Sequence, residues 1–273
     1  KKSINMRDIH QLTQKELQAV KNLKKNLILH IPHSSHKIPL NKGYVVDQIT
    51  LDQEIIKLTD WYTDDLFLFK DSIPVKAGFS RIFCDTERFS DDSQEVMAKY
   101  GMGVLYEKSD DGALIREITK KLREEILSNY YWPHHEKLNK VVNEQLESNG
   151  KALIVDCHSF PSRPLIRDLS QEDNRPDFNI GTDSFHTPNY LIEISKDFFK
   201  EKGYSFGIDW PYSGSIVPLN HYQKTKNVSS IMIEINRALY LNEPGNQKSN
   251  NYIKTKQTIT EYLKVLKTAF DDL

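Results

Sequence analysis

Histidines near the ends of two apolar runs are the side chains best suited to chemistry in this sequence. His30 and His33 occur in HIPHSS at the end of the run 26–31, and His158 lies at the end of the run 151–159. Such runs are typical of buried strands, and in open α/β sheets sites form beyond the carboxyl ends of strands. Neutral imidazole is the commonest zinc ligand, and catalytic zinc takes three protein ligands. His33 and His158 therefore predict a catalytic zinc site with one ion per chain, unless each histidine only bonds neighbouring backbone.

Four carboxylates are candidates for the third ligand: Asp60, Asp85, Asp156 and Glu234. Asp60 could equally be an ordinary carboxylate on a helix surface. Asp156 precedes His158 by two residues, so the two side chains share a strand face and Asp156 can orient the imidazole.

Glu234 lies in an apolar strand between Ile233 and Ile235. Burying a charged carboxylate in such a strand costs free energy unless the carboxylate is paired with a cation, bonded to metal-bound water, or protonated. The raised pKa that burial produces is also what a general base near pH 7 needs. We therefore predict that Glu234 is the catalytic base, and a structural, paired acid is the alternative.

Arginines gather in or next to the irregular stretches 80–103 and 159–187 and the strand of Glu234. Six of the nine arginines lie there: Arg81, Arg88, Arg163, Arg167, Arg175 and Arg237. In a chain that otherwise uses lysine, this placement favours a bidentate grip on a substrate carboxylate. Structural ion pairs with nearby aspartates are the alternative for any one of them.

Short apolar runs alternate with amphipathic runs along the chain, which predicts an α/β fold. We expect a single domain, 1–273, with three α/β/α layers and a mixed, mostly parallel central sheet. The expected strands are 26–31, 73–79, 151–159, 204–208 and 229–239. The expected helices are 13–25, 55–69, 111–128, 132–147 (ended by Gly150), 190–202 and 252–270.

Composition narrows the class of protein. The 273 residues carry 37 basic and 38 acidic side chains, a formal net charge of -1, which argues against a nucleic-acid binder. No apolar run approaches the roughly 18 residues of a membrane span, and no signal segment opens the chain. Two cysteines cannot build a disulfide framework. We expect a cytoplasmic protein whose partner is a small molecule, with the oligomeric state left open.

Eight stretches together resemble the N-formylglutamate amidohydrolase family. In the family's order, from about residue 27 to 241, they are HIPHSS, TDWYTDDLF, SRIFCDTERFSDDSQEVMAKYGMGVLY, HHEKL, DCHSFPSRPL, NIGTDSFHTP, PYSGSIVP and SIMIEINRALY. This family is similar to zinc carboxypeptidases and aspartoacylases. The resemblance therefore implies a mixed sheet between helices and one catalytic zinc.

The resemblance also implies ligands and a base. His33 and His158 match the two histidine ligands, and Glu234 matches the glutamate that activates water. The relatives place a glutamate three residues after the first histidine, but this chain has His36 there. The acidic ligand must come from elsewhere, or His36 itself serves, and Asp60 is our choice.

Substrate contacts follow from the same resemblance. Arg81 matches an arginine that polarises the scissile carbonyl. Asp85, Glu87 and Arg88 stand where aspartoacylase-like enzymes carry an Asp-x-Asn-Arg motif, whose arginine grips a substrate carboxylate. Glu87 replaces the asparagine, which departs from that pattern. We assign substrate binding to Arg88, Arg237 and Asp85.

The implied function is zinc-dependent hydrolysis of N-formyl-L-glutamate, or a similar N-acyl acidic amino acid, to formate and L-glutamate. That reaction is the last step of one route of histidine degradation. An amidase or carboxypeptidase-like enzyme for another N-acyl or peptidic substrate remains an alternative. So does a non-catalytic metal- or ligand-binding protein of the same fold.

Overall fold

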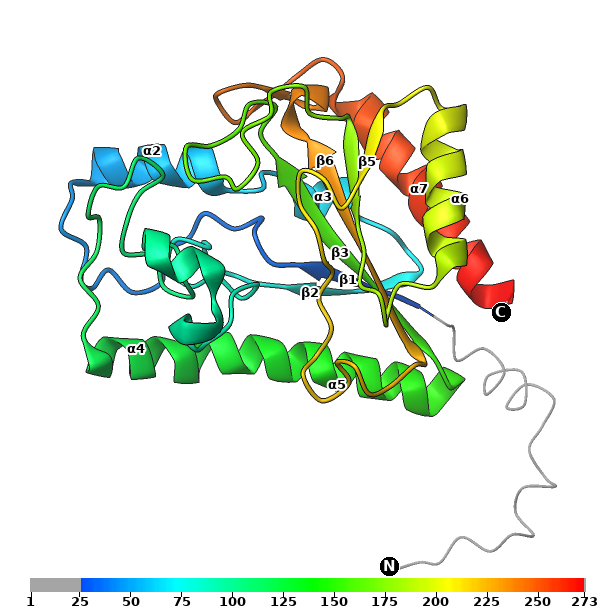
Figure 1. Ribbon diagram of the computed structural model, residues 1–273, viewed down its shortest axis with the longest axis horizontal. Coiled ribbons are helices and arrows are strands. Elements are labelled where there is room, and N and C mark those ends of the chain that lie inside the picture. The colour runs from blue at the N-terminus through cyan, green and yellow to red at the C-terminus, as the bar shows by residue number, and fades with distance from the viewer. Residues whose placement is uncertain (1–25, 273) are drawn as a thin grey trace, which may run out of the picture.

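The computed structural model describes residues 26–272 as a six-stranded sheet with helices on both faces (Figure 1). The sheet strands are β1 (Leu27–Ile31), β2 (Ser72–Lys76), β3 (Ala152–Phe160), β4 (Phe178–Gly181), β5 (Phe206–Ile208) and β6 (Val228–Asn236). The helices are α2 (Gln48–Leu58), α3 (Thr63–Leu66), α4 (Lys120–Ile126), α5 (Trp132–Asn149), α6 (Asn189–Glu201) and α7 (Tyr252–Asp272). A short hairpin joins β7 (Leu241–Asn242) to β8 (Gln247–Lys248). The expected helix 13–25 lies outside the described residues.

The sheet is mixed and mostly parallel, as expected. Its strand order is β2-β1-β3-β6-β4-β5, and only the β4–β6 pair is antiparallel. In this register His30 pairs with Asp156 on the neighbouring strand, and His158 pairs with Glu234. The three central strands therefore bring residues from three parts of the chain to one edge of the sheet.

Helices cover both sheet faces, which confirms the three-layer α/β architecture. Alternate residues of a strand face opposite sides, so Ile28 and Ile154 pack with Leu138 and Val142 of α5. Their neighbours along the strands, such as Val155, pack in the other core layer with α3, α6 and α7. Figure 1 shows α5 along one side of the sheet and α6 and α7 on the other.

One expected helix begins later in the chain than predicted. The predicted helix 111–128 begins only at Lys120, after the N-cap Thr119. Asp111 does not start a helix because its carboxylate accepts hydrogen bonds from the Ser109 hydroxyl and the Ala113 N–H, which closes a local turn. The helix 132–147 is confirmed, and Gly150 ends it with φ 72, a left-handed conformation that glycine adopts without strain.

The expected helix 55–69 is broken in two. α2 ends at Leu58, and the N–H and hydroxyl of the following Thr59 both donate to the Ile55 carbonyl, at 3.1 and 2.6 Å. Tyr62 then has φ 63, so the chain leaves the helical path before α3 starts. Apolar spacing of three and four residues continues across the break, which is why periodicity alone does not reveal it.

No helix in the described residues 26–272 combines the length and apolar character that crossing a membrane requires.

Candidate metal and active site

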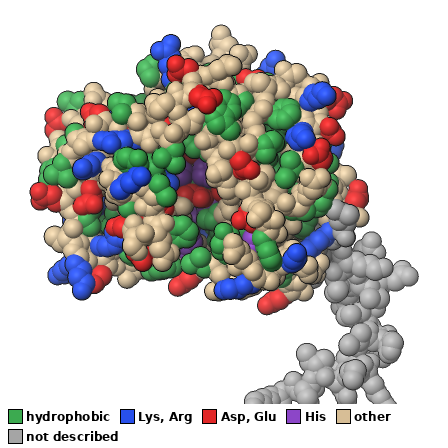
Figure 2. Space-filling view, in the orientation of Figure 1, with side chains coloured by type: hydrophobic (Ala, Val, Ile, Leu, Met, Phe, Trp, Pro, Cys, Tyr) green, Lys and Arg blue, Asp and Glu red, His purple; other side chains and the backbone are tan. Residues whose placement is uncertain are grey.

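A cavity of about 250 Å³ opens beyond the carboxyl ends of β1, β3 and β6. Figure 2 shows histidine and acidic side chains inside a hollow on this face. The residues that matter for chemistry are His33, Asp60, Arg81, Arg88, His158 and Glu234, and all of them line the cavity. The structure therefore brings most of the predicted site residues together.

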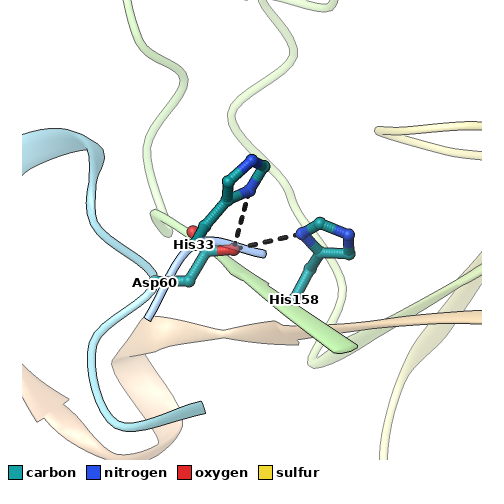
Figure 3. Close-up of side chains that lie close together, drawn as sticks. All are labelled: His33, Asp60 and His158. Carbon is teal, nitrogen blue, oxygen red and sulfur yellow. Dashed lines mark hydrogen bonds and ion pairs between the residues drawn. The ribbon is translucent and has the colours of Figure 1, made fainter. Parts of the chain in front are cut away.

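His33, Asp60 and His158 form one cluster, with candidate ligand atoms within 4.8 Å of one another (Figure 3). Asp60 Oδ2 lies 3.2 Å from His158 Nδ1 and 3.5 Å from His33 Nδ1. All three residues are at most 5% exposed. Two imidazoles and one carboxylate are a ligand set that zinc accepts at catalytic sites.

Other carboxylates fix both imidazole rings. His33 Nε2–H donates to Asp85 Oδ1 at 2.7 Å, and His158 Nε2–H donates to Asp156 Oδ1 at 3.0 Å. This leaves the two Nδ1 atoms facing Asp60. Carboxylate–histidine pairs of this kind orient metal-ligating imidazoles. His33 Nδ1 is buried and has no hydrogen-bond partner, so these residues fit a metal ion.

The break after α2 places Asp60 in the cluster. Its N–H donates to the His33 carbonyl at 3.0 Å, which joins the two segments directly. Arg237 Nη2 donates to Asp60 Oδ1 at 2.9 Å. Burial acts to raise the pKa of Asp60, but the neighbouring His158 and His33 rings and the charge of Arg237 lower the pKa below its ordinary value. Asp60 is therefore an anion aimed at the two histidines.

His36 does not join this cluster. Its ring is exposed and stacks on Trp61, with ring centroids 5.4 Å apart. Of the two alternatives for the third ligand, the geometry favours Asp60.

Glu234 lies on β6 and faces the cavity beside Met232. Its side chain is 7% exposed, and its Oε2 has no hydrogen-bond partner. Burial, together with the charge of Asp60, raises the pKa of Glu234 from its usual 4.5 to about 8, although His158, Arg81 and Arg237 act against the shift. A carboxylate of this pKa is suited to accept and return a proton near neutral pH.

Arg81 belongs to a small network around Asp85. Arg81 Nη2 donates to Asp85 Oδ2 at 3.1 Å, and Arg81 Nε donates to the Tyr106 hydroxyl at 3.1 Å. Tyr106 donates in turn to Asp85 Oδ2 at 2.7 Å. Sequence reasoning missed Tyr106, because nothing in its spacing links it to residues more than twenty positions earlier.

Arg88 is the less tightly held arginine of this cavity. Its Nε lies 3.6 Å from Asp85 Oδ2 and has no hydrogen-bond partner, and its Nη1 lies 3.8 Å from Glu95 Oε1. An arginine that lines a cavity with an unused donor is available to a ligand carboxylate. This geometry agrees with the predicted role of Arg88 in substrate binding, which stays a prediction.

Asp85 and Arg237 are bound more tightly by neighbouring residues than Arg88 is. Asp85 is fully buried, and its carboxylate accepts hydrogen bonds from His33, Arg81 and Tyr106. The guanidinium of Arg237 donates to Asp60 at 2.9 Å, to Ser159 Oγ at 3.2 Å and to a backbone carbonyl at 2.7 Å. Both geometries favour positioning of the cluster over the predicted contact with substrate.

The other singled-out arginines have separate surroundings. Arg175 is a structural ion pair, with Nη2 2.8 Å from Asp168 Oδ2. Arg167 lines the cavity, and its Nε donates to the Asp110 carbonyl at 3.1 Å. Arg163 lines a neighbouring depression instead. Arginine usage alone therefore did not separate ligand-binding from structural positions.

Comparison with solved structures shows the same fold elsewhere. The crystal structure of an N-formylglutamate amidohydrolase from Ralstonia eutropha JMP134 superposes with a TM-score of 0.78 at 21% identity, covering 90% of this chain and 94% of that one. The crystal structure of a gene product of Agrobacterium tumefaciens gives a TM-score of 0.61 at 15% identity, covering 90% and 93%. No curated protein matches the sequence.

The sequence itself matches the profile of one family over residues 25–241, which is most of the chain. That span contains the histidine pair, Asp60, Arg81, Arg88 and Glu234. The chain belongs to the N-formylglutamate amidohydrolase family.

Proposed function

We propose that this protein is a zinc-dependent amidohydrolase that cleaves N-formyl-L-glutamate, or a closely related N-acyl acidic amino acid, to the free acid and L-glutamate. One observation carries the proposal. A ligand cluster of His33, Asp60 and His158 shares a cavity with a proton-accepting carboxylate, Glu234, and an available cation, Arg88. Family membership supports the same reaction class.

His33, Asp60 and His158 would hold the ion. When bound there, zinc would supply Lewis-acid polarisation of the scissile carbonyl and would make water acidic enough to attack near pH 7. Asp85 and Asp156 keep the imidazole rings in orientation, and Arg237 keeps Asp60 ionised and in place. These contacts limit the reorganisation that the site needs before reaction.

Glu234 handles the proton in this proposal. Its unpartnered Oε2 is placed to accept a proton from the attacking water and to return it to the leaving amine nitrogen. Positioned acid–base groups of this kind contribute typically about 10²–10⁴ in rate. Arg81, bonded to Asp85 and Tyr106 at the cavity wall, supplies positive charge where a carbonyl oxygen becomes negative.

The cavity suits a small acidic substrate. Its volume of about 250 Å³ is below the roughly 300–1,000 Å³ of pockets for drug-sized ligands. A small amino-acid derivative therefore fits it better than a larger ligand does. Arg88 supplies the guanidinium that a carboxylate requires.

Metal analysis coupled to formate release tests the proposal. We expect that His33→Ala loses one zinc ion per chain relative to the parent protein and loses formate release from N-formyl-L-glutamate. N-formyl-L-glutamine is the matched control, because it keeps the α-carboxylate and carries a neutral amide in place of the side-chain carboxylate, and we expect much slower turnover of it. Unchanged zinc content in His33→Ala would refute the ligand assignment, and equal turnover of the two substrates would refute the acidic-substrate assignment.

A further inference from the structure

A second cluster of donor atoms lies behind the first one. His30 Nδ1 is 2.8 Å from Asp156 Oδ1 and 3.0 Å from Glu87 Oε1. The candidate ligand atoms of these three residues all lie within 4.8 Å of one another. His30 is fully buried, Asp156 is 1% exposed, and the Glu87 side chain is 20% exposed. Two carboxylate oxygens thus converge on one ring nitrogen.

A proton on His30 cannot satisfy this arrangement alone. One N–H points along one line, and the shorter contact is with Asp156. Glu87 Oε1 is then buried without a hydrogen-bond partner. Within residues 26–272, neither carboxylate has a lysine or arginine at ion-pair distance, and their ionic partners are His30 and His158. Buried carboxylates of this kind require a compensating cation.

We propose that His30, Glu87 and Asp156 form a second metal site, which binds a divalent transition-metal ion of the zinc or manganese class. One ion at this position would satisfy His30 Nδ1, Glu87 Oε1 and Asp156 Oδ1 together, which one proton cannot do. One imidazole and two carboxylates are donors that both Zn²⁺ and Mn²⁺ accept. The proposal goes beyond the catalytic site and raises the expected content from one ion to two per chain.

The separations between donor atoms suit a bound ion. Ligand atoms of a tetrahedral zinc site, with bonds of about 2.0–2.2 Å, lie roughly 3.3–3.5 Å apart. The observed separations of 2.8 and 3.0 Å need only a small expansion. Asp156 Oδ1 also accepts a hydrogen bond from His158 Nε2 at 3.0 Å, and a carboxylate oxygen has two lone pairs, so it can do both.

His134 fixes the tautomer that metal binding needs. Its Nε2 lies 2.8 Å from His30 Nε2, so one of the two nitrogens donates to the other. At this distance the His134 ring can accept the proton of His30 Nε2–H. His30 Nδ1 is then free to bind an ion, with its ring oriented from behind.

The second site is accessible. Glu87 lines both the 250 Å³ cavity and an adjoining cavity of about 350 Å³, and Asp156 lines the latter. His158 lies between the two sites, with Nδ1 toward Asp60 and Nε2 toward Asp156 and Glu87. The two ions would therefore be neighbours on opposite sides of one imidazole ring.

Titration of metal-free protein with Zn²⁺, read by calorimetry and by metal analysis, tests the second site. We expect two ions in the parent protein and one in Glu87→Gln, which keeps the shape and removes the charge. The second ion should bind at least about 100-fold more weakly in this variant. Glu54→Gln removes another buried glutamate, one bonded to Lys57 and the Asp110 N–H, and should keep both ions.

His33→Ala separates this proposal from the proposed function. The second-site proposal expects one remaining ion in His33→Ala and none in the double variant with Glu87→Gln. One ion in the parent protein that Glu87→Gln retains would overturn the second site. If Glu87→Gln loses its native circular-dichroism spectrum, titration of the parent protein with Co²⁺ replaces the variant as the test. A second equivalent of Co²⁺ that adds no new absorption would also overturn the second site.

Discussion

At the scale of single residues, the unpartnered oxygen of Glu234 is the sharpest link between environment and chemistry. Glu234→Gln keeps the size of the side chain and removes its ability to accept a proton. We expect this variant to fold, to retain the ion at His33, Asp60 and His158, and to lose at least about a hundredfold in kcat. Steady-state kinetics and metal analysis check it. Near-normal turnover would place the base elsewhere, with His134 or His135 next to be tested.

The raised pKa of Glu234 also predicts how the stability of the metal-free protein depends on pH. Burial raises the pKa from 4.5 to about 8, so between these values the folded protein binds a proton that the unfolded chain has released. Stability from this group is therefore present at low pH and is lost as pH rises through about 8. Urea denaturation of chelated protein should show this fall, and Glu234→Gln should reduce it. An identical pH dependence in both proteins would contradict the assignment.

Arg88 supplies the residue-scale test of substrate preference. Lysine keeps the charge but cannot make the planar two-point contact with a carboxylate. Charge-assisted hydrogen bonds contribute about 1.5–3 kcal/mol, so Arg88→Lys should lower kcat/KM for N-formyl-L-glutamate roughly 10- to 100-fold. Lys99→Arg is an exposed exchange of the same two residue types and should change nothing. A proportional loss with N-formyl-L-glutamine would show that Arg88 does not recognise the side-chain carboxylate.

At the scale of elements, strand ends were predictable and helix breaks were not. Continuous apolar runs such as 151–159 identify buried strands, and the polar residues that follow them mark the site. The break between α2 and α3 depends on Tyr62 in a left-handed conformation, which no local sequence signal requires. Yet that break carries Asp60 into the site. The four-residue strand β4 fell in a stretch expected to be irregular, because such a short segment shows no periodicity.

The long helical run that begins at α4 gives a test of an individual element. The Thr119 hydroxyl accepts a hydrogen bond from the Leu122 N–H at 3.2 Å and caps the helix. Losing such a cap costs about 1 kcal/mol, so Thr119→Ala should lower the free energy of unfolding by that amount. The exposed Thr268, inside α7, bonds only the Lys264 carbonyl, and Thr268→Ala serves as the control. Equal stabilities of the two variants would show that the cap contributes nothing.

At the scale of the whole molecule, the net charge is small although several acidic side chains lie together in one region. The chain carries a formal net charge of -1, yet the buried Asp60, Asp85 and Asp156 and the partly exposed Glu87 lie together near the carboxyl ends of the strands. Arginines balance Asp60 and Asp85. Composition could not reveal this cluster of acidic residues, because the cluster depends on which distant segments the parallel strands bring together.

Metal removal should therefore lower the stability of the whole folded protein. A ligand that binds only the folded state stabilises it by about 2.7 kcal/mol when present at a hundred times its Kd. For a chain of this size, each kcal/mol corresponds to roughly 2–4 °C in Tm, so zinc should raise the Tm of chelated protein by about 5–10 °C. Scanning calorimetry with and without zinc measures the shift. His33→Ala should lose the part of the shift that comes from the catalytic site, and Glu87→Gln should keep that part. An equal, full shift in His33→Ala would mean that zinc acts on the fold at other residues.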